Sequence, residues 1–176
     1  AEYRCVLDDG MSELVASVPQ YDAVVIASPV FFFSISCQAK AFLDRFFCLI
    51  KHREDGSIAT PLGRVGLAFI TTSGGDEDDS GVRNIYGTMR DCAAFLGSGE
   101  PKFLYYGLCG DPAVFKADPA NAEKAAAFFF WSESLRRLRR LMGARALERR
   151  RKARGRGRMD KDAFARRTTA LQVSLY

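Results

Sequence analysis

The chain has 176 residues, of which 48% are hydrophobic and 27% charged, and its net charge is +5. This is the composition of a globular domain, and it excludes both a wholly disordered chain and a collagen-like rod. The longest apolar stretches, 28–33 and 125–131, are far shorter than the roughly 20 residues of a membrane span, so we expect no such span.

Apolar periodicity predicts helices that alternate with buried strands. Segments with apolar residues three and four positions apart are predicted as helices, and continuously apolar segments as strands covered on both faces. In chain order these are a helix over 11–18 behind Asp8-Asp9, a strand over 23–28, a helix over 39–50, a strand over 65–71, a helix over 82–96, a strand over 102–108 and a helix opened by Asp118-Pro119. The alternation predicts a three-layer α/β fold with a parallel sheet.

The last part of the chain is strongly basic. From Arg136 to Arg167 there are 15 Lys/Arg and 3 Asp/Glu, and the apolar periodicity stops beyond about Arg149. We therefore predict a domain over 1–148 and a basic, mobile tail over 149–176. Such a tail either attracts nucleic acid or another anionic partner, or is a solvated extension without a partner.

The cysteines give no metal or disulfide pattern. Five cysteines lie far apart, no two form a Cys-x-x-Cys pair, and there is one histidine. These features argue against a disulfide framework and against a self-contained zinc site. We expect a reducing compartment, the cytoplasm, and no bound metal.

The residues that follow the predicted strands favour a binding site. The first strand is followed by a Pro-aromatic segment over 28–34, the second by a hydroxyl and glycine segment over 71–75, and the third by Gly107-Leu108-Cys109-Gly110. Ligands of open parallel sheets bind at the carboxyl ends of strands, and this combination suits a flat heteroaromatic ring with polar edges. Ordinary turns, with Phe31 to Phe33 in the core or in a subunit contact, are the alternative reading.

Three segments carry a family resemblance. The segment 21–45, with its Ser-Pro-Val-Phe strand end and Gln-x-Lys-x-Phe-x-Asp-Arg helix, resembles the signature of the flavodoxin-like NAD(P)H-dependent FMN reductase family. The segment 62–75 is similar to the next strand and the flavin-side loop of that family. The opening Cys5-Val-Leu-Asp-Asp-Gly-Met is similar to a stretch of its iron-sulfur flavoprotein branch.

The resemblance implies an FMN site with two walls and no catalytic base, because the flavin carries the redox chemistry. Phe31 stands where the family usually has Tyr, and Phe33 where glycine is frequent. The implied FMN-binding residues are Ser28, Pro29, Val30, Phe31, Phe32 and Ser34 on one side and Thr72, Ser73, Gly74 and Gly75 on the other.

Two parts of the family pattern have no counterpart in this sequence. The first strand and its phosphate loop are lacking, so the resemblance implies a partial, N-terminally truncated flavodoxin-like domain over 1–148. The strand over 23–28 should then have an open, apolar edge. Of the cysteine cluster in the iron-sulfur branch only Cys5 remains, and one thiolate cannot hold a cluster that needs four.

The expected function is FMN-dependent oxidation of NAD(P)H, with a hydride passed from the nicotinamide to FMN and on to a small-molecule acceptor such as a quinone. The resemblance also implies a homo-oligomer. The alternative is a non-catalytic flavodoxin-like module for binding or electron transfer, which docks on an anionic partner through its basic tail.

Overall fold

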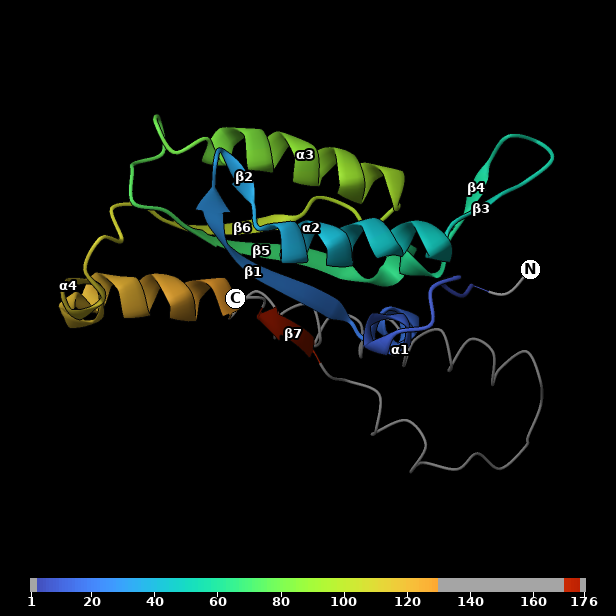
Figure 1. Cartoon of the computed structure of the whole chain (residues 1–176), viewed down its shortest axis with the longest axis horizontal. Helices are drawn as coiled ribbons and strands as arrows, with labels where there is room; N and C mark the ends of the chain where they lie inside the picture. The colour runs from blue at the N-terminus through green and yellow to red at the C-terminus, as the bar shows by residue number, and fades with distance from the viewer. Residues whose placement is uncertain (1–2, 130–169, 175–176) are drawn as a thin grey trace, which may run out of the picture.

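The fold is a parallel sheet between helical layers (Figure 1). The computed structural model describes residues 3–129 and 170–174. Four strands pair in parallel in the order β7 (Ala170–Ser174), β1 (Ala23–Phe31), β5 (Gly66–Thr72) and β6 (Lys102–Tyr106). The two-residue strand β2 (Ser34–Ile35) pairs antiparallel with the end of β1. The predicted α/β class and parallel sheet are therefore confirmed.

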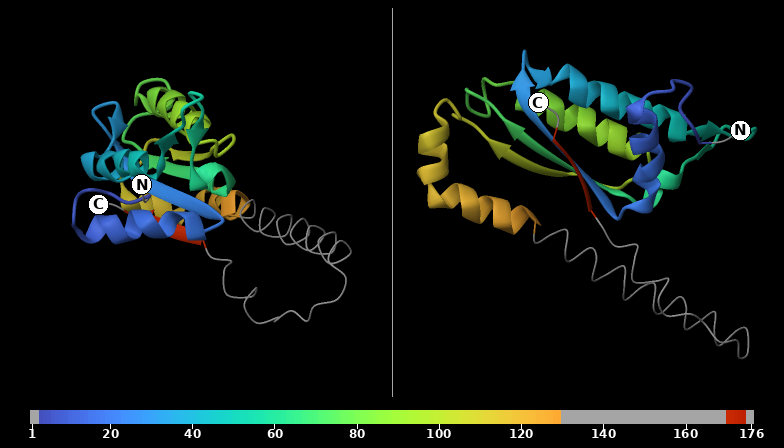
Figure 2. Two further views of the ribbon diagram at one scale, coloured as in Figure 1. Left: turned by 90° about the vertical axis from the view of Figure 1, so that its right-hand side faces the viewer. Right: turned by 60° about the horizontal axis from the view of Figure 1, so that its bottom comes forward.

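The helices form layers on both sides of the sheet. Figures 1 and 2 show α2 and α3 over one face and helical residues 119–129 on the opposite side. The α-helices are α1 (Gly10–Ser17), α2 (Cys37–Asp44), α3 (Val82–Phe95) and α4 (Pro112–Ala117). The remaining elements are the 3₁₀ helices η1 (Val18–Gln20), η2 (Arg45–Leu49) and η3 (Pro61–Arg64) and the hairpin of β3 (Lys51–His52) and β4 (Ile58–Ala59).

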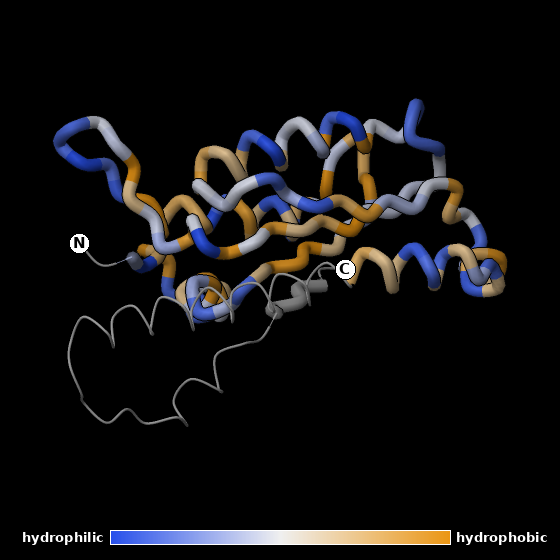
Figure 3. Tube along the Cα trace, turned by 180° about the vertical axis from the view of Figure 1, so that it is seen from behind, coloured by the Kyte–Doolittle hydropathy of each residue, from blue (hydrophilic) through white to orange (hydrophobic). Residues whose placement is uncertain are grey.

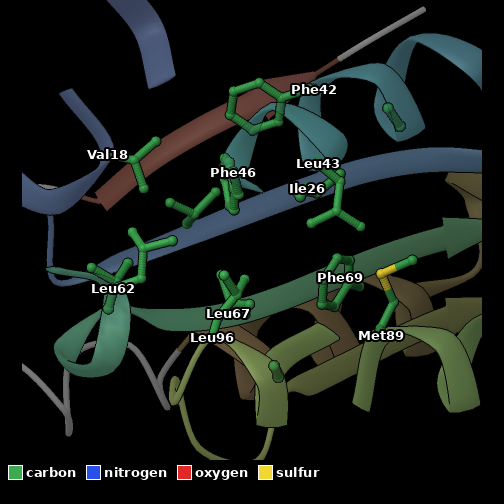
Figure 4. Close-up of a cluster of buried hydrophobic side chains, with 14 of the residues drawn as sticks. Val18, Ile26, Phe42, Leu43, Phe46, Leu62, Leu67, Phe69, Met89 and Leu96 are labelled. Atoms are coloured by element: carbon green, nitrogen blue, oxygen red, sulfur yellow. The ribbon is translucent and has the colours of Figure 1, made fainter. Parts of the chain in front are cut away.

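The core lies between the sheet and the α2–α3 layer. Figure 3 shows hydrophobic residues along the central strands, and Figure 4 shows Phe42 and Phe46 above Ile26 and Leu67. All four of these side chains are at most 2% exposed. Their burial, worth about 1.5–3 kcal/mol for each large side chain, fixes the strands beneath the helices and so holds the strand ends in place.

Side-chain caps set the helix starts where the sequence predicts them. Asp9 accepts a hydrogen bond from the Ser12 N–H at the start of α1, and Asp118 accepts one from the Ala120 N–H. The predicted helix over 39–50 is shorter than expected. It ends at Asp44 and continues as η2, in which aromatic residues with low helix propensity complete a tighter turn.

Strand β7 corrects the prediction of an open edge. Its residues pair in parallel with β1 from Ala23↔Ala170 to Ala27↔Ser174, so this edge of β1 is covered. The strand lies within the range 149–176 that was predicted as a tail, and residues 149–169 lie outside the described part of the chain. A five-residue run after a long basic segment is a weak strand signal, so the sequence did not predict this strand.

Candidate functional site at the carboxyl ends of the strands

The two predicted walls lie next to each other. Strands β1 and β5 are parallel neighbours, with Ser28 opposite Thr71 and Pro29 opposite Thr72, so both following loops start at the same edge (Figure 1). The loops also meet further out. A Cβ atom added to Gly81, at the start of α3, would lie 2.7 Å from the Cβ of Phe33. The segments after β1 and β5 thus form one continuous surface.

The first wall is an aromatic hairpin with unusual backbone angles. The turn between β1 and β2 has φ of 46° at Phe32 and 66° at Phe33, which matches the type I′ turn normally made by Asn-Gly. These angles are unfavourable for bulky residues. Phe31 is 62% exposed and Phe32 95%, so the reading in which they pack in the core is wrong. Exposed aromatic side chains on a strained backbone are typical of a surface that binds a ligand or a partner.

Ser28 of the first wall and Ser36, which follows the wall, hold the hairpin together. Ser28 is buried, and its Oγ accepts a hydrogen bond from the Ser36 N–H at 2.8 Å and donates to the Pro29 carbonyl at 2.9 Å. Ser36 in turn caps α2 by accepting from the Ala39 N–H. Val30 is half-buried against the core, whereas Ser34 is exposed. Within this set, Phe31, Phe32 and Ser34 are the accessible groups.

The second wall is held by a hydrogen-bond network around a tyrosine that the sequence analysis did not single out. The Tyr105 hydroxyl lies within hydrogen-bond distance of Ser73 Oγ, at 2.6 Å, and of the Gly75 carbonyl and Ser80 Oγ, both at 3.1 Å. Ser73 Oγ also donates to the Gly75 carbonyl at 2.8 Å. Tyr105 reads as one more core aromatic of a predicted strand, so no sequence signal separated it from its neighbours.

The glycines of this wall keep free hydrogen-bond donors. The Ser73 N–H donates to the Tyr106 carbonyl, but the N–H groups of Gly74 and Gly75 have no partner among the described residues. A Cβ atom at Gly74 would meet nothing within 4 Å, so its backbone is open to an approaching ligand. Thr72 is half-buried beside them. At Gly75 the space is filled, because a Cβ atom there would collide with the carboxylate of Asp79. The open donor of Gly74, with the unpaired N–H of Gly75 next to it, suits the carbonyl and ring-nitrogen acceptors of a heteroaromatic ring.

The loop after β6 joins the same site. The Leu108 N–H donates to the Gly75 carbonyl and the Cys109 N–H to the Ser73 carbonyl, each at 2.9 Å. A Cβ atom at Gly107 would lie 2.9 Å from both the Gly75 carbonyl and the Tyr105 hydroxyl, so only glycine permits this close approach. The ends of β5 and β6 are therefore locked to each other.

Replacing Tyr105 with phenylalanine tests this lock. We expect a loss of about 1–3 kcal/mol in the free energy of unfolding, because the partly buried hydroxyls of Ser73 and Ser80 lose a partner. Urea unfolding measures the loss. As a control, Tyr3 to Phe removes an exposed hydroxyl with no hydrogen bond among the described residues and should change stability by less than about 0.5 kcal/mol. A Tyr105 to Phe variant with the same free energy of unfolding as the original chain would contradict the role of the network.

Cys5 lies away from the strand-end loops. Its Sγ accepts a hydrogen bond from Arg45 Nη1 at 2.9 Å, and Arg45 also pairs with Asp9 at 2.6 Å. The pKa of Cys5 is lowered, mainly by a hydrogen bond from the Leu7 backbone and further by Arg45. In the described part of the chain no group of three or more His, Cys, Asp or Glu side chains could hold a metal ion. No helix there is long and apolar enough to cross a membrane.

Comparison with known proteins decides the family. The sequence profile of the NADPH-dependent FMN reductase family matches residues 1–96, more than half of the chain. The chain belongs to this family. The match includes both the segment 21–45 and the segment 62–75, so the resemblance drawn from their residues is confirmed.

Named proteins of other organisms align over parts of this chain. An iron-sulfur flavoprotein of Archaeoglobus fulgidus is 44% identical over 68 residues, which cover 36% of this chain and 31% of that protein. An FMN-dependent NADH:quinone oxidoreductase of Vibrio parahaemolyticus is 30% identical over 95 residues, which cover 52% of this chain and 48% of that protein. The chain thus matches less than half the length of either relative.

A solved structure agrees with the fold assigned to this FMN reductase family member. The Trp repressor binding protein of Bacillus subtilis superposes with a TM-score of 0.51 at 17% sequence identity. The superposition covers 69% of this chain and 73% of that chain. At this identity the likeness establishes the shared α/β fold and nothing about a ligand.

Proposed function

We propose that this chain binds FMN at the carboxyl ends of β1, β5 and β6 and acts as an NAD(P)H-dependent oxidoreductase with a small-molecule acceptor such as a quinone. The observation that carries the proposal is that the exposed rings of Phe31 and Phe32 and the unpaired N–H groups of Gly74 and Gly75 stand on the loops that follow two neighbouring parallel strands. Membership of the FMN reductase family and the name of the Vibrio relative support the same cofactor and reaction class.

The residues present fit a flavin in chemical type. An isoalloxazine ring has apolar faces and a polar edge of carbonyl and nitrogen acceptors. Phe31 and Phe32 offer apolar contact to a face, and the glycine donors offer hydrogen bonds to the edge. Since the backbone at Gly74 is open, a ring can approach the Gly74 donor without displacing a side chain.

The chain's own task in such a reaction is binding and orientation. When bound, FMN supplies the redox chemistry, taking a hydride from NAD(P)H and releasing electrons to an acceptor. The donors of Gly74 and Gly75 are fixed by the network around Tyr105 before any ligand arrives, so no hydrogen bonds need to be rearranged. Since the flavin carries the redox chemistry, the proposal requires no catalytic acid or base from the chain at the strand ends.

Titration of the purified chain with FMN tests the proposal. We expect the fluorescence of FMN to change on binding, the melting temperature to rise with FMN, and oxidation of NADH or NADPH when a soluble quinone is added. Replacing Phe32 with asparagine, which tolerates the left-handed backbone, should weaken FMN binding several-fold. The matched control is Phe47 to Asn, because Phe47 is 62% exposed but belongs to η2. A chain that neither binds FMN nor is stabilised by it would refute the proposal.

A further inference from the structure

Leu108 combines an unfavourable backbone with an exposed apolar side chain. Its φ is 56°, in the left-handed region that leucine avoids, and its side chain is 75% exposed. Packing within the described chain therefore does not compensate the strain. Glycines stand at positions 107 and 110 of the same loop, so the chain places a large apolar residue at a point where glycine would relieve the backbone.

The surrounding contacts hold Leu108 beside the free donors. Its N–H donates to the carbonyl of Gly75, and the next N–H, of Cys109, donates to the carbonyl of Ser73. The absent side chain of Gly107 allows the loop to approach Gly75 this closely. Leu108 is thus locked onto the loop that carries the unpaired N–H groups of Gly74 and Gly75, and its exposed side chain is available to a ligand bound there.

We propose that Leu108 is a ligand-contacting residue of this site, an apolar wall on the β6 side that packs against the planar ring bound at Gly74 and Gly75. The proposal rests on the proposed FMN-binding function and adds a contact that the two-wall site over 28–34 and 72–75 does not include. The backbone of Leu108 is strained, and no packing of its side chain within the described chain compensates the strain. A strained residue next to unpaired backbone donors is expected where ligand binding, rather than folding, requires that residue.

Replacing Leu108 with glycine separates binding from stability. We expect the melting temperature to stay equal or rise, because glycine adopts φ of 56° without strain, while the Kd for FMN increases about 10-fold as an apolar contact is lost. Leu108 to Met, which keeps an apolar side chain of similar volume, should bind FMN within about threefold of the original chain. Fluorescence titration with FMN gives the Kd values, and thermal unfolding without ligand gives the stabilities.

The control and the outcomes distinguish this proposal from the function on which it rests. Val114 to Ala removes a second exposed apolar side chain, 68% exposed on α4, and should leave the Kd unchanged. If the original chain binds FMN and the Leu108 to Gly variant binds it within twofold, this assignment is overturned and the proposed function stands. If the Leu108 to Gly variant binds FMN more weakly and also melts at a lower temperature, the assignment is overturned too, because the loss of binding then comes from a loss of structure. If the original chain does not bind FMN, both proposals fall.

Discussion

Replacing Gly81 with alanine should destabilise the protein by about 2–4 kcal/mol. Two costs add up at this position. The residue has φ of 79°, which is unfavourable for any side chain, and the new Cβ would lie within 3 Å of the Cα, Cβ and Cδ1 atoms of Phe33. Two of these three atoms lie next to or within the backbone of a tight hairpin, so they cannot move aside cheaply. Chemical unfolding of the original chain and of the Gly81 to Ala variant measures the difference in their free energies of unfolding.

Gly56 provides a control that isolates the steric cost. It has φ of 78°, but a Cβ atom there would meet nothing within 4 Å, so Gly56 to Ala should cost only about 1–2 kcal/mol. Adding Phe33 to Gly to the Gly81 to Ala variant should recover part of the additional loss, because the Cβ and ring of Phe33 are gone while its Cα remains close to the new Cβ. Equal losses for the two alanine variants, or no recovery in the double variant, would show that Phe33 does not press on Gly81.

Two consecutive prolines in β7, at Leu171 and Gln172, should cost at least about 3 kcal/mol and cause association of the protein. Successive N–H groups of a strand point to opposite edges, so one of the two prolines must remove a donor that faces β1. The buried residues Ala23 to Ile26 would then lie at an open edge and expose unpaired backbone groups. Size-exclusion chromatography and urea unfolding measure both effects.

The matching control keeps the backbone donors of β7. Alanine at both positions leaves every N–H group in place, so this variant should remain monodisperse to the same degree as the original chain. Hydrogen exchange at Val25 and Ala27, whose N–H groups face the β7 edge of β1, adds a local readout, because their protection should fall in the proline variant alone. If the proline and alanine variants behave alike, the pairing of β7 with β1 is wrong.

The strands and helices of the core could be predicted because their residues carry a single, consistent pattern. The buried runs at 23–28 and 65–71 are apolar at nearly every position, and the caps Asp9 and Asp118 stand where helices begin. Both signals are local, so they need no knowledge of the rest of the molecule. The position of the two walls followed from the same reasoning, since parallel neighbours bring their carboxyl ends together.

What the sequence did not reveal depends on contacts between distant segments. Tyr105 lies in a strand of alternating burial and acts through the hydroxyls of Ser73 and Ser80, which the chain order separates from it by more than 20 positions. The left-handed angles of Phe32, Phe33 and Leu108 follow from turns whose residues are not the usual Asn or Gly. The pairing of β7 likewise has no local signature that distinguishes it from other short apolar runs.

The place of β7 has a consequence for how the protein forms. Its partner β1 is made early relative to Ala170–Ser174, which emerge from the ribosome after all other described residues. Until β7 docks, the sheet formed by the preceding described strands has β1 at its border, and closing this edge requires a search across the long segment between the two strands, which slows folding. The docking of β7 beside β1 is therefore expected to be a late step in the folding of this sheet.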